Sequence, residues 1–299
     1  MTPLRVIDRV QRNTAFGVRF WDTASASGVI PGLQVEVFAR TRPGARARAQ
    51  MTPSGIYVTH AVPGLREWEF MEAGSDELWA QAASRYRVEV RDPMGRFLPI
   101  AFDADLPARS LFTWRAPWFS PPRAIVLPGE PGSPAQLMLE RVPLFSAPAR
   151  GLPHAAAVLR AQLRILGLER PAAWTLLAVT IDGAVRGIGL SDAEGRIAVV
   201  FPYPEPPRRA LTSPPEARND FSWELELTAF IPAPLLASPP RAVPLADLTD
   251  IFDALNTPRV VVESFISPAL PLRLSYREPL TVRTAGATGA DASYLFVAV

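Results

Sequence analysis

Hydrophobic residues stand at every second position along much of the chain, which is the period of a β-strand with one buried face. In residues 196–202, Ile197, Val199 and Phe201 alternate with smaller or polar residues, and Pro202 ends the run. The same alternation predicts strands at residues 4–10, 16–22, 33–38, 56–62, 86–91, 96–102, 157–166, 174–181, 185–190, 221–230, 272–276, 280–283 and 294–299. Strands this short and this numerous predict a mainly β protein.

Two turns with matching surroundings suggest that the chain repeats one unit. Asp192 and Gly195 open the strand at 196–202, and Thr52-Pro-Ser-Gly55 opens the strand at 56–62. The alternating strands at 86–90 and 223–227 begin 31 and 28 residues after these two glycines. Spacings that agree this well predict two copies of one antiparallel sandwich.

Helical periodicity is confined to two segments. Residues 75–84 form a short helix candidate, with Ser75 as the N-cap and acids in the first turn. Residues 245–255 give the stronger pattern, and Pro258 follows as a stop signal. The apolar stripe of this second helix consists of Leu245, Leu248, Ile251, Phe252 and Leu255.

Composition and length divide the chain into two domains and a stiff connection. The 33 prolines and 18 glycines among 299 residues favour many short strands with ordered loops. We predict a first β-sandwich domain at 1–120, a Pro-rich interdomain segment at 121–153 and a second β-sandwich domain at 154–299. Near the start of the connection, Trp114, Trp118 and Phe119 either lock it onto the first domain or bind a partner.

The charge pattern gives no indication of nucleic-acid binding. All 31 basic residues are arginine, which a GC-rich genome explains, and use of the guanidinium at interfaces is the alternative. The formal net charge is only +2, so the pI of about 9.4 reflects the lack of groups that titrate between pH 7 and 9. The arginine-rich run at 40–48 is interpreted as a solvated loop.

No targeting or membrane signal is found in the sequence. Cysteine is absent, which excludes disulfides and thiol chemistry. The N-terminus lacks the apolar core of a signal peptide, and no stretch reaches the roughly 20 apolar residues of a membrane span. We expect synthesis in the cytoplasm, no membrane insertion, and release, if any, as part of an extracellular particle.

Candidates for catalysis or metal binding are few. The two histidines, His60 and His154, lie on a strand and in the connection, without the nucleophile and acid that a catalytic histidine needs. The pairs Asp103–Asp105 and Asp192–Glu194 lack the further acids of a calcium loop. We therefore predict no catalytic residue, no metal and no cofactor.

Two further patterns have structural explanations. Asp247, Asp250 and Asp253 recur at helical spacing, as on a solvated helix face. The glycines of residues 183–189 lie between two predicted strands and open no helix, so they do not form a phosphate-binding loop.

The turn motif Asp/Ser-x-x-Gly-Arg/Ile, followed by an alternating strand and proline, resembles the core of transthyretin-like, carboxypeptidase-regulatory-type β-sandwiches. In that family a strand of the form Asp…Gly…Pro-Gly-Leu-x-Val precedes the motif, and residues 22–35 are similar to it. The resemblance implies two immunoglobulin- or transthyretin-like sandwiches. It assigns structural turns to Asp22, Gly28, Gly55, Asp192 and Gly195.

The chain also resembles proteins encoded with extracellular contractile injection systems, which are phage-tail-like particles. The similar segments are residues 18–22, 95–99, 105–109 and 143–148. This resemblance implies a non-enzymatic structural or adaptor protein, whose partners are other protein subunits or further copies of itself. Contacts would come from sheet edges, from Pro- and Arg-rich loops, and from Tyr294 and Phe296 in the last strand, which either pairs inside the fold or extends a neighbour's sheet.

Two other functions are compatible with the sequence. A carbohydrate- or surface-binding module would stack sugars on exposed tryptophans, for which the candidates are Trp21, Trp68, Trp79, Trp114 and Trp118. A hydrolase would need catalytic groups brought together from distant parts of the chain.

Overall fold

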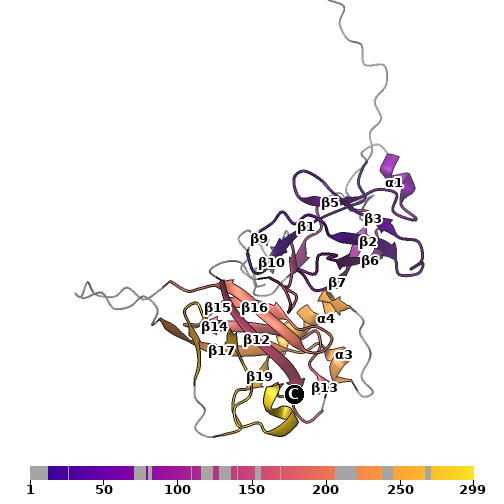
Figure 1. Cartoon of the computed structure of the whole chain (residues 1–299). Helices are drawn as coiled ribbons and strands as arrows, with labels where there is room; N and C mark the ends of the chain where they lie inside the picture. Colours follow the sequence, from indigo (N-terminus) through magenta and orange to yellow (C-terminus); the bar gives the residue numbers. More distant parts are fainter. Residues whose placement is uncertain are drawn as a thin grey trace, which may run out of the picture.

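The computed structural model describes residues 13–25, 27–70, 79, 83–108, 110–115, 124–127, 136–139, 141–151, 156–168, 170–205, 221–237, 245–266 and 271–299. For 114–115, 124–127 and 136–139 it describes the backbone alone. The protein is mainly β, as predicted, and its strands form several sheets (Figure 1). No helix in this part of the chain has the length and apolar character needed to cross a membrane.

Two sheets, built mainly from the first half of the chain, form a sandwich. Their strand orders are β11-β1-β5-β4 and β18-β7-β6-β2-β3. The strands are β1 (Phe16–Asp22), β2 (Gln34–Ala39), β3 (Ala47–Arg48), β4 (Gln50–Met51), β5 (Ile56–Thr59), β6 (Ser84–Arg91), β7 (Ile100–Leu106), β11 (Val142–Leu144) and β18 (Ala246–Asp247). Alternate residues of β1 and β7, among them Phe16, Phe20 and Phe102, are fully buried in one shared core. The two sheets therefore face each other as a sandwich.

The second half forms one continuous sheet that wraps around its own core. Its main path is β13-β12-β22-β19-β17-β14-β15, and β16 and β21 pair with β12 while β20 pairs with β17. The strands are β12 (Ala156–Ile165), β13 (Arg170–Pro171), β14 (Leu176–Ile181), β15 (Ala184–Leu190), β16 (Arg196–Pro202), β17 (Ser222–Phe230), β19 (Arg259–Val262), β20 (Leu272–Ser275), β21 (Leu280–Thr281) and β22 (Leu295–Val297). The last strand, β22, pairs with β12 on one side and with β19 on the other.

Strand pairing follows a similar order in both halves. The strand after the matching turn, at 52–55 or 192–195, pairs antiparallel with the first strand of its half, as β5 with β1 and β16 with β12. A later strand then pairs in parallel with that first strand, as β11 with β1 and β22 with β12. This agreement is what a repeated unit requires, although the number of domains stays a prediction.

Strand β14 is buried on both faces and connects the two halves. Leu177, Val179 and Ile181 belong to the core of the second half. Leu176 and Ala178, on the opposite face, belong to the same cluster of buried residues as the first sandwich. Because both faces of the strand meet apolar surroundings, successive residues are all apolar, which explains the sequence Leu-Leu-Ala-Val.

The helix α4 (Leu248–Asp253) also lies between the halves, as Figure 1 shows. The predicted apolar stripe is buried, but the helix begins three residues later than predicted. The reason is that Ala246 and Asp247 extend as β18 and pair in parallel with Ile100 and Ala101 of β7. Asp247 caps the helix through Thr249 N (2.9 Å), and its carboxylate also binds Arg87 of β6.

Other predicted elements need correction. The strand predicted at 96–102 begins at Ile100, after Pro99, and β7 pairs on both edges and is not an edge strand. The strand predicted at 56–62 ends at Thr59, because Ala61 has a positive φ of 56°.

The helices α1 (Arg66–Phe70) and α3 (Ala233–Leu236) were not predicted. The predicted strand at 4–10 and nearly all of the predicted helix at 75–84 lie outside the described residues.

The predicted connection at 121–153 contains strands. Strands β9 (Ala124–Leu127) and β10 (Gln136–Leu139) pair with each other, and β8 (Trp114–Arg115) joins them in a small sheet. Strand β11 belongs to the first sandwich. The segment is thus not a bare extended linker over the part that the structure describes.

The glycines of residues 183–189 have a packing role. A β-carbon on Gly187 would lie 2.7 Å from the ring of Phe201, and one on Gly189 would lie 2.9 Å from the side chain of Val199. Both contacts are too short for real β-carbons, so glycine lets β15 approach β16 closely.

Candidate functional site

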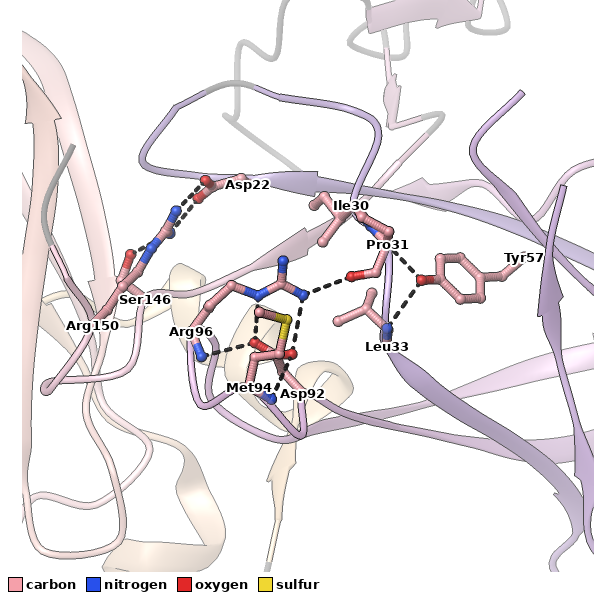
Figure 2. A network of polar contacts seen from close by, with 10 residues as sticks. All are labelled: Asp22, Ile30, Pro31, Leu33, Tyr57, Asp92, Met94, Arg96, Ser146 and Arg150. Carbon is pink, nitrogen blue, oxygen red and sulfur yellow. Dashed lines mark hydrogen bonds and ion pairs between the residues drawn. The ribbon is translucent and has the colours of Figure 1, made fainter. Parts of the chain in front are cut away.

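A buried ion pair fixes the first turn of the chain to the segment after β11. Arg150 donates to both carboxylate oxygens of Asp22 at 2.8 and 2.6 Å, as Figure 2 shows. Ser25 Oγ and the backbone N–H of Ala24 also donate to this carboxylate, and Ser146 Oγ accepts from Arg150. Burial acts to raise the pKa of Asp22, but these hydrogen bonds outweigh it and hold the pKa below its ordinary value.

A second polar network orders the loops beside the first (Figure 2). Arg96 donates to both carboxylate oxygens of Asp92 at 2.9 and 3.1 Å and to the carbonyl of Pro31 at 2.7 Å. The Tyr57 hydroxyl donates to the carbonyl of Ile30 and accepts from the N–H of Leu33. Every one of these contacts is internal, so the network stabilises the loops.

Asp92 and Asp192 build the same turn, 100 residues apart. In each, the glycine N–H donates to the carbonyl of the aspartate, and the following arginine donates from both its N–H and its side chain to the carboxylate. The sequences are Asp-Pro-Met-Gly-Arg and Asp-Ala-Glu-Gly-Arg. The Thr52–Gly55 turn shares the backbone bonds and replaces the carboxylate with the Thr52 hydroxyl.

Gly195 and Gly95 give a matched pair for testing this turn. Their φ angles are 78° and 67°, where any β-carbon is strained. A β-carbon at Gly195 would also lie 2.3 Å from the carbonyl oxygen of Leu163, whereas one at Gly95 meets nothing within 4 Å. We expect Gly95→Ala to cost about 1–2 kcal/mol in the free energy of unfolding and Gly195→Ala to cost roughly 3 kcal/mol or more. Urea unfolding measures both, and equal losses would show that the Leu163 contact is unimportant.

The remaining turn residues have particular neighbours. Gly28 leaves room for Arg141, since a β-carbon there would lie 2.0 Å from the guanidinium. Gly55 has a φ of 76° and lies against Val29. The positive φ at Gly55 favours glycine, whereas the atoms near Gly28 belong to the movable end of the Arg141 side chain.

Among the described residues, the candidate catalytic and metal-binding side chains form no cluster. The buried Nδ1 of His60 has no hydrogen-bond partner in this part of the chain, and His154 lies outside it. Asp103 and Asp105 form ion pairs with Arg87 and Arg85 across the sheet. Within the described ranges, no three His, Asp or Glu residues are close enough together to hold a metal ion.

The tryptophans proposed for sugar stacking are mainly internal. Trp21 and Trp79 are buried, and Trp68 packs edge-on against Trp79 at 5.2 Å between ring centroids. Trp21 and Trp79 therefore present no open face to a sugar, and Trp68 is partly buried against the core. The backbone of Trp114 lies in β8, and Trp118 and Phe119 lie outside the described residues.

An exposed apolar surface surrounds the last two paired strands, β19 and β22. Phe296 is buried, with its ring 5.6 Å from that of Phe265, and Tyr294 packs under the guanidinium of Arg164 at 4.8 Å. Around them, the side chains that stay exposed are Val260 at 70%, Phe265 at 51%, Ile266 at 61% and Val299 at 56%. We call these four residues the C-terminal surface.

The four residues lie at the two ends of the paired strands β19 and β22. Ala298 N–H donates to the carbonyl of Val260, so the backbone of Val260 lies beside the end of β22, and its side chain points away from the core that Val261 and Val297 share. Phe265 and Ile266 follow β19, and Phe265 covers Phe296. Of the two residues predicted to bind a partner here, Phe296 serves as the buried base of the surface.

No protein-family model matches this chain, and no curated protein matches it either. The geometry alone defines the class: a mainly β protein whose two halves share a core and whose C-terminal strand lies beneath an exposed apolar surface.

Proposed function

We propose that the protein is a non-enzymatic structural or adaptor component of a large protein assembly and binds a neighbouring subunit through the C-terminal surface. The observation that supports this function is that four large apolar side chains stay exposed on or just beyond β19 and β22. Contiguous exposed apolar surface is typical of protein interaction sites. Covering it contributes roughly 1 kcal/mol per side chain, since about half of each remains exposed.

The resemblance of four short segments to proteins of contractile, phage-tail-like particles suggests the setting. Contact through a free edge of the last strand is not part of the proposal, because both edges of β22 are already paired within the fold. The subunit would bind to side chains of the surface and not to the backbone of this strand.

The double substitution Val260→Gln/Ile266→Gln tests the function. Both side chains are exposed, so we expect little change in the thermal unfolding temperature and loss of co-sedimentation with the assembly from native cells. Met94→Gln is the matched control, since Met94 is 70% exposed in the first half of the chain. Co-sedimentation of the double variant at the level of the unsubstituted protein would contradict the proposal.

A further inference from the structure

Four aromatic side chains meet at one end of the second half of the protein. Neighbouring ring centroids lie 5.0 to 6.5 Å apart, and the residues are Tyr203, Phe221, Trp223 and Tyr276. Trp223 is only 7% exposed, while the other three rings are partly exposed and pack against the same core. We call these four residues the aromatic cluster. Trp223 lies in the part of β17 that pairs with β20, at the opposite end from the part that pairs with β19, so the cluster is separate from the C-terminal surface.

Three hydrogen-bond donors of the aromatic cluster have no acceptor among the described residues. The hydroxyls of Tyr57 and Tyr86 each donate to a backbone carbonyl of the protein. By contrast, the hydroxyls of Tyr203 and Tyr276 and the indole N–H of Trp223 donate to no residue in this part of the chain. Such groups normally find a partner when their rings are buried. The indole nitrogen of Trp223 is not fully buried, so an acceptor outside the protein can reach it.

The surroundings of the cluster keep these donors available and carry little net charge. Burial raises the pKa of Tyr203 above its ordinary value, although the backbone N–H of Arg277 acts to lower it, so the hydroxyl stays protonated at neutral pH. The guanidinium of Arg277 stacks on the ring of Tyr276 at 5.2 Å. The charged residues next to the cluster in the sequence are Glu205, Arg277 and Glu278, all of them exposed. Because neither sign dominates strongly, the site suits an uncharged ligand.

The angles between the rings indicate which uncharged ligand fits. Tyr276 is inclined at 65° to Tyr203 and at 67° to Trp223, so the rings form ridges and not the flat platform on which a sugar stacks. Prolyl rings pack against aromatic ridges of this kind. The carbonyls of a polyproline II helix form no hydrogen bonds within that helix, so they are free to accept from Tyr O–H and Trp N–H groups.

We propose that the aromatic cluster binds a proline-rich segment of a partner protein in the polyproline II conformation. The rings of the cluster contact the prolines, and the hydroxyls of Tyr203 and Tyr276 and the indole N–H of Trp223 donate to backbone carbonyls of the segment. This is a second interaction site, and it does not depend on the binding of a subunit to the C-terminal surface.

Fluorescence anisotropy of a labelled decaproline peptide mixed with the full chain tests the proposal. We expect binding with a Kd below roughly 1 mM and no binding of a glycine–serine peptide of the same length. The Kd should change little between about 0.05 and 0.5 M salt, because the contact involves no ion pair. No binding of decaproline up to roughly 1 mM, or binding of oligosaccharides on a glycan array in its place, would overturn the inference.

The double substitution Tyr203→Phe/Tyr276→Phe keeps both rings and removes only the two hydroxyls. Since these hydroxyls donate to no described residue, the unfolding temperature should change little, whereas the Kd for decaproline should rise about tenfold. Tyr294→Phe is the matched control, because Tyr294 is a partly exposed tyrosine outside the cluster, and it should leave the Kd unchanged. Equal Kd values for the double variant and the unsubstituted protein would contradict the proposal.

The variant Val260→Gln/Ile266→Gln separates this inference from the proposed function. It should bind decaproline as tightly as the unsubstituted protein does, even where it fails to co-sediment with the assembly. If it loses decaproline binding while Tyr203→Phe/Tyr276→Phe keeps it, the peptide binds to the C-terminal surface, and the inference about the aromatic cluster fails alone.

Discussion

Deleting residues 294–299 is expected to unfold the second half of the protein. Strand β22 lies between β12 and β19, and Leu295, Phe296 and Val297 are buried. Burial of such side chains contributes about 1.5–3 kcal/mol each, or roughly 5–9 kcal/mol for three, against about 5–15 kcal/mol for the stability of a whole domain. Thermal unfolding followed by circular dichroism should show the cooperative transition lost or greatly lowered.

Removing Val299 alone is the control for this deletion. Val299 is more than half exposed and follows the paired strand, so the unfolding temperature should stay within a few degrees. A cooperative transition near the usual temperature after the full deletion would mean that β22 contributes little. The deletion is therefore a test of folding, and substitutions on the C-terminal surface are the better test of binding.

Arg150→Ala is expected to lower the free energy of unfolding by about 3–5 kcal/mol, because it leaves the buried Asp22 carboxylate without its cation. Urea unfolding at pH 7 measures the loss. Arg273→Ala is the control, since the pair that it forms with Glu224 is exposed on both sides and should contribute about 0–1 kcal/mol.

The ion pair between Arg150 and Asp22 also makes the loss of stability in Arg150→Ala depend on pH. The pKa of Asp22 and that of Asp92 are held below the ordinary value of 3.8, so their contribution is present at neutral pH and is lost as the pH falls below that value. In Arg150→Ala the burial of Asp22 remains and favours the neutral acid. The difference between the variant and the unsubstituted protein should therefore shrink below about pH 4. A difference that stays constant from pH 7 to pH 3 would argue against the role of this pair.

The local pattern of the sequence predicts most of the strands. The alternation at 157–166 and 221–230 corresponds to β12 and β17 within one residue at each end, and the fold class follows from such strands. Strand β19 was not predicted, because Arg-Val-Val-Val lacks alternation and its exposed and buried valines look alike. Strands of two residues, such as β3 and β13, are too short to give any pattern.

Contacts between distant residues limit the prediction further. Arg87 and Asp247 are 160 positions apart, and nothing near Asp247 indicates that the two residues before the helix pair with β7. The motif Asp-x-x-Gly-Arg recurs at 92–96 and 192–196, but that the two segments form the same hydrogen-bonded turn follows only from the structure. The C-terminal surface was predicted only through Tyr294 and Phe296, because exposure depends on which neighbouring strands cover each face.

Because β14 is buried on both faces, it limits the substitutions that the protein can accept during evolution. Leu176 and Ala178 belong to the buried cluster that contains the first sandwich and α4, while Leu177 and Val179 belong to the core of the second half. A substitution that changes the side-chain volume at one of these positions requires compensating substitutions at residues distant in the sequence. Substitutions in the two halves should therefore be accepted in concert, and neither half is free to be exchanged for an unrelated module without refitting this strand.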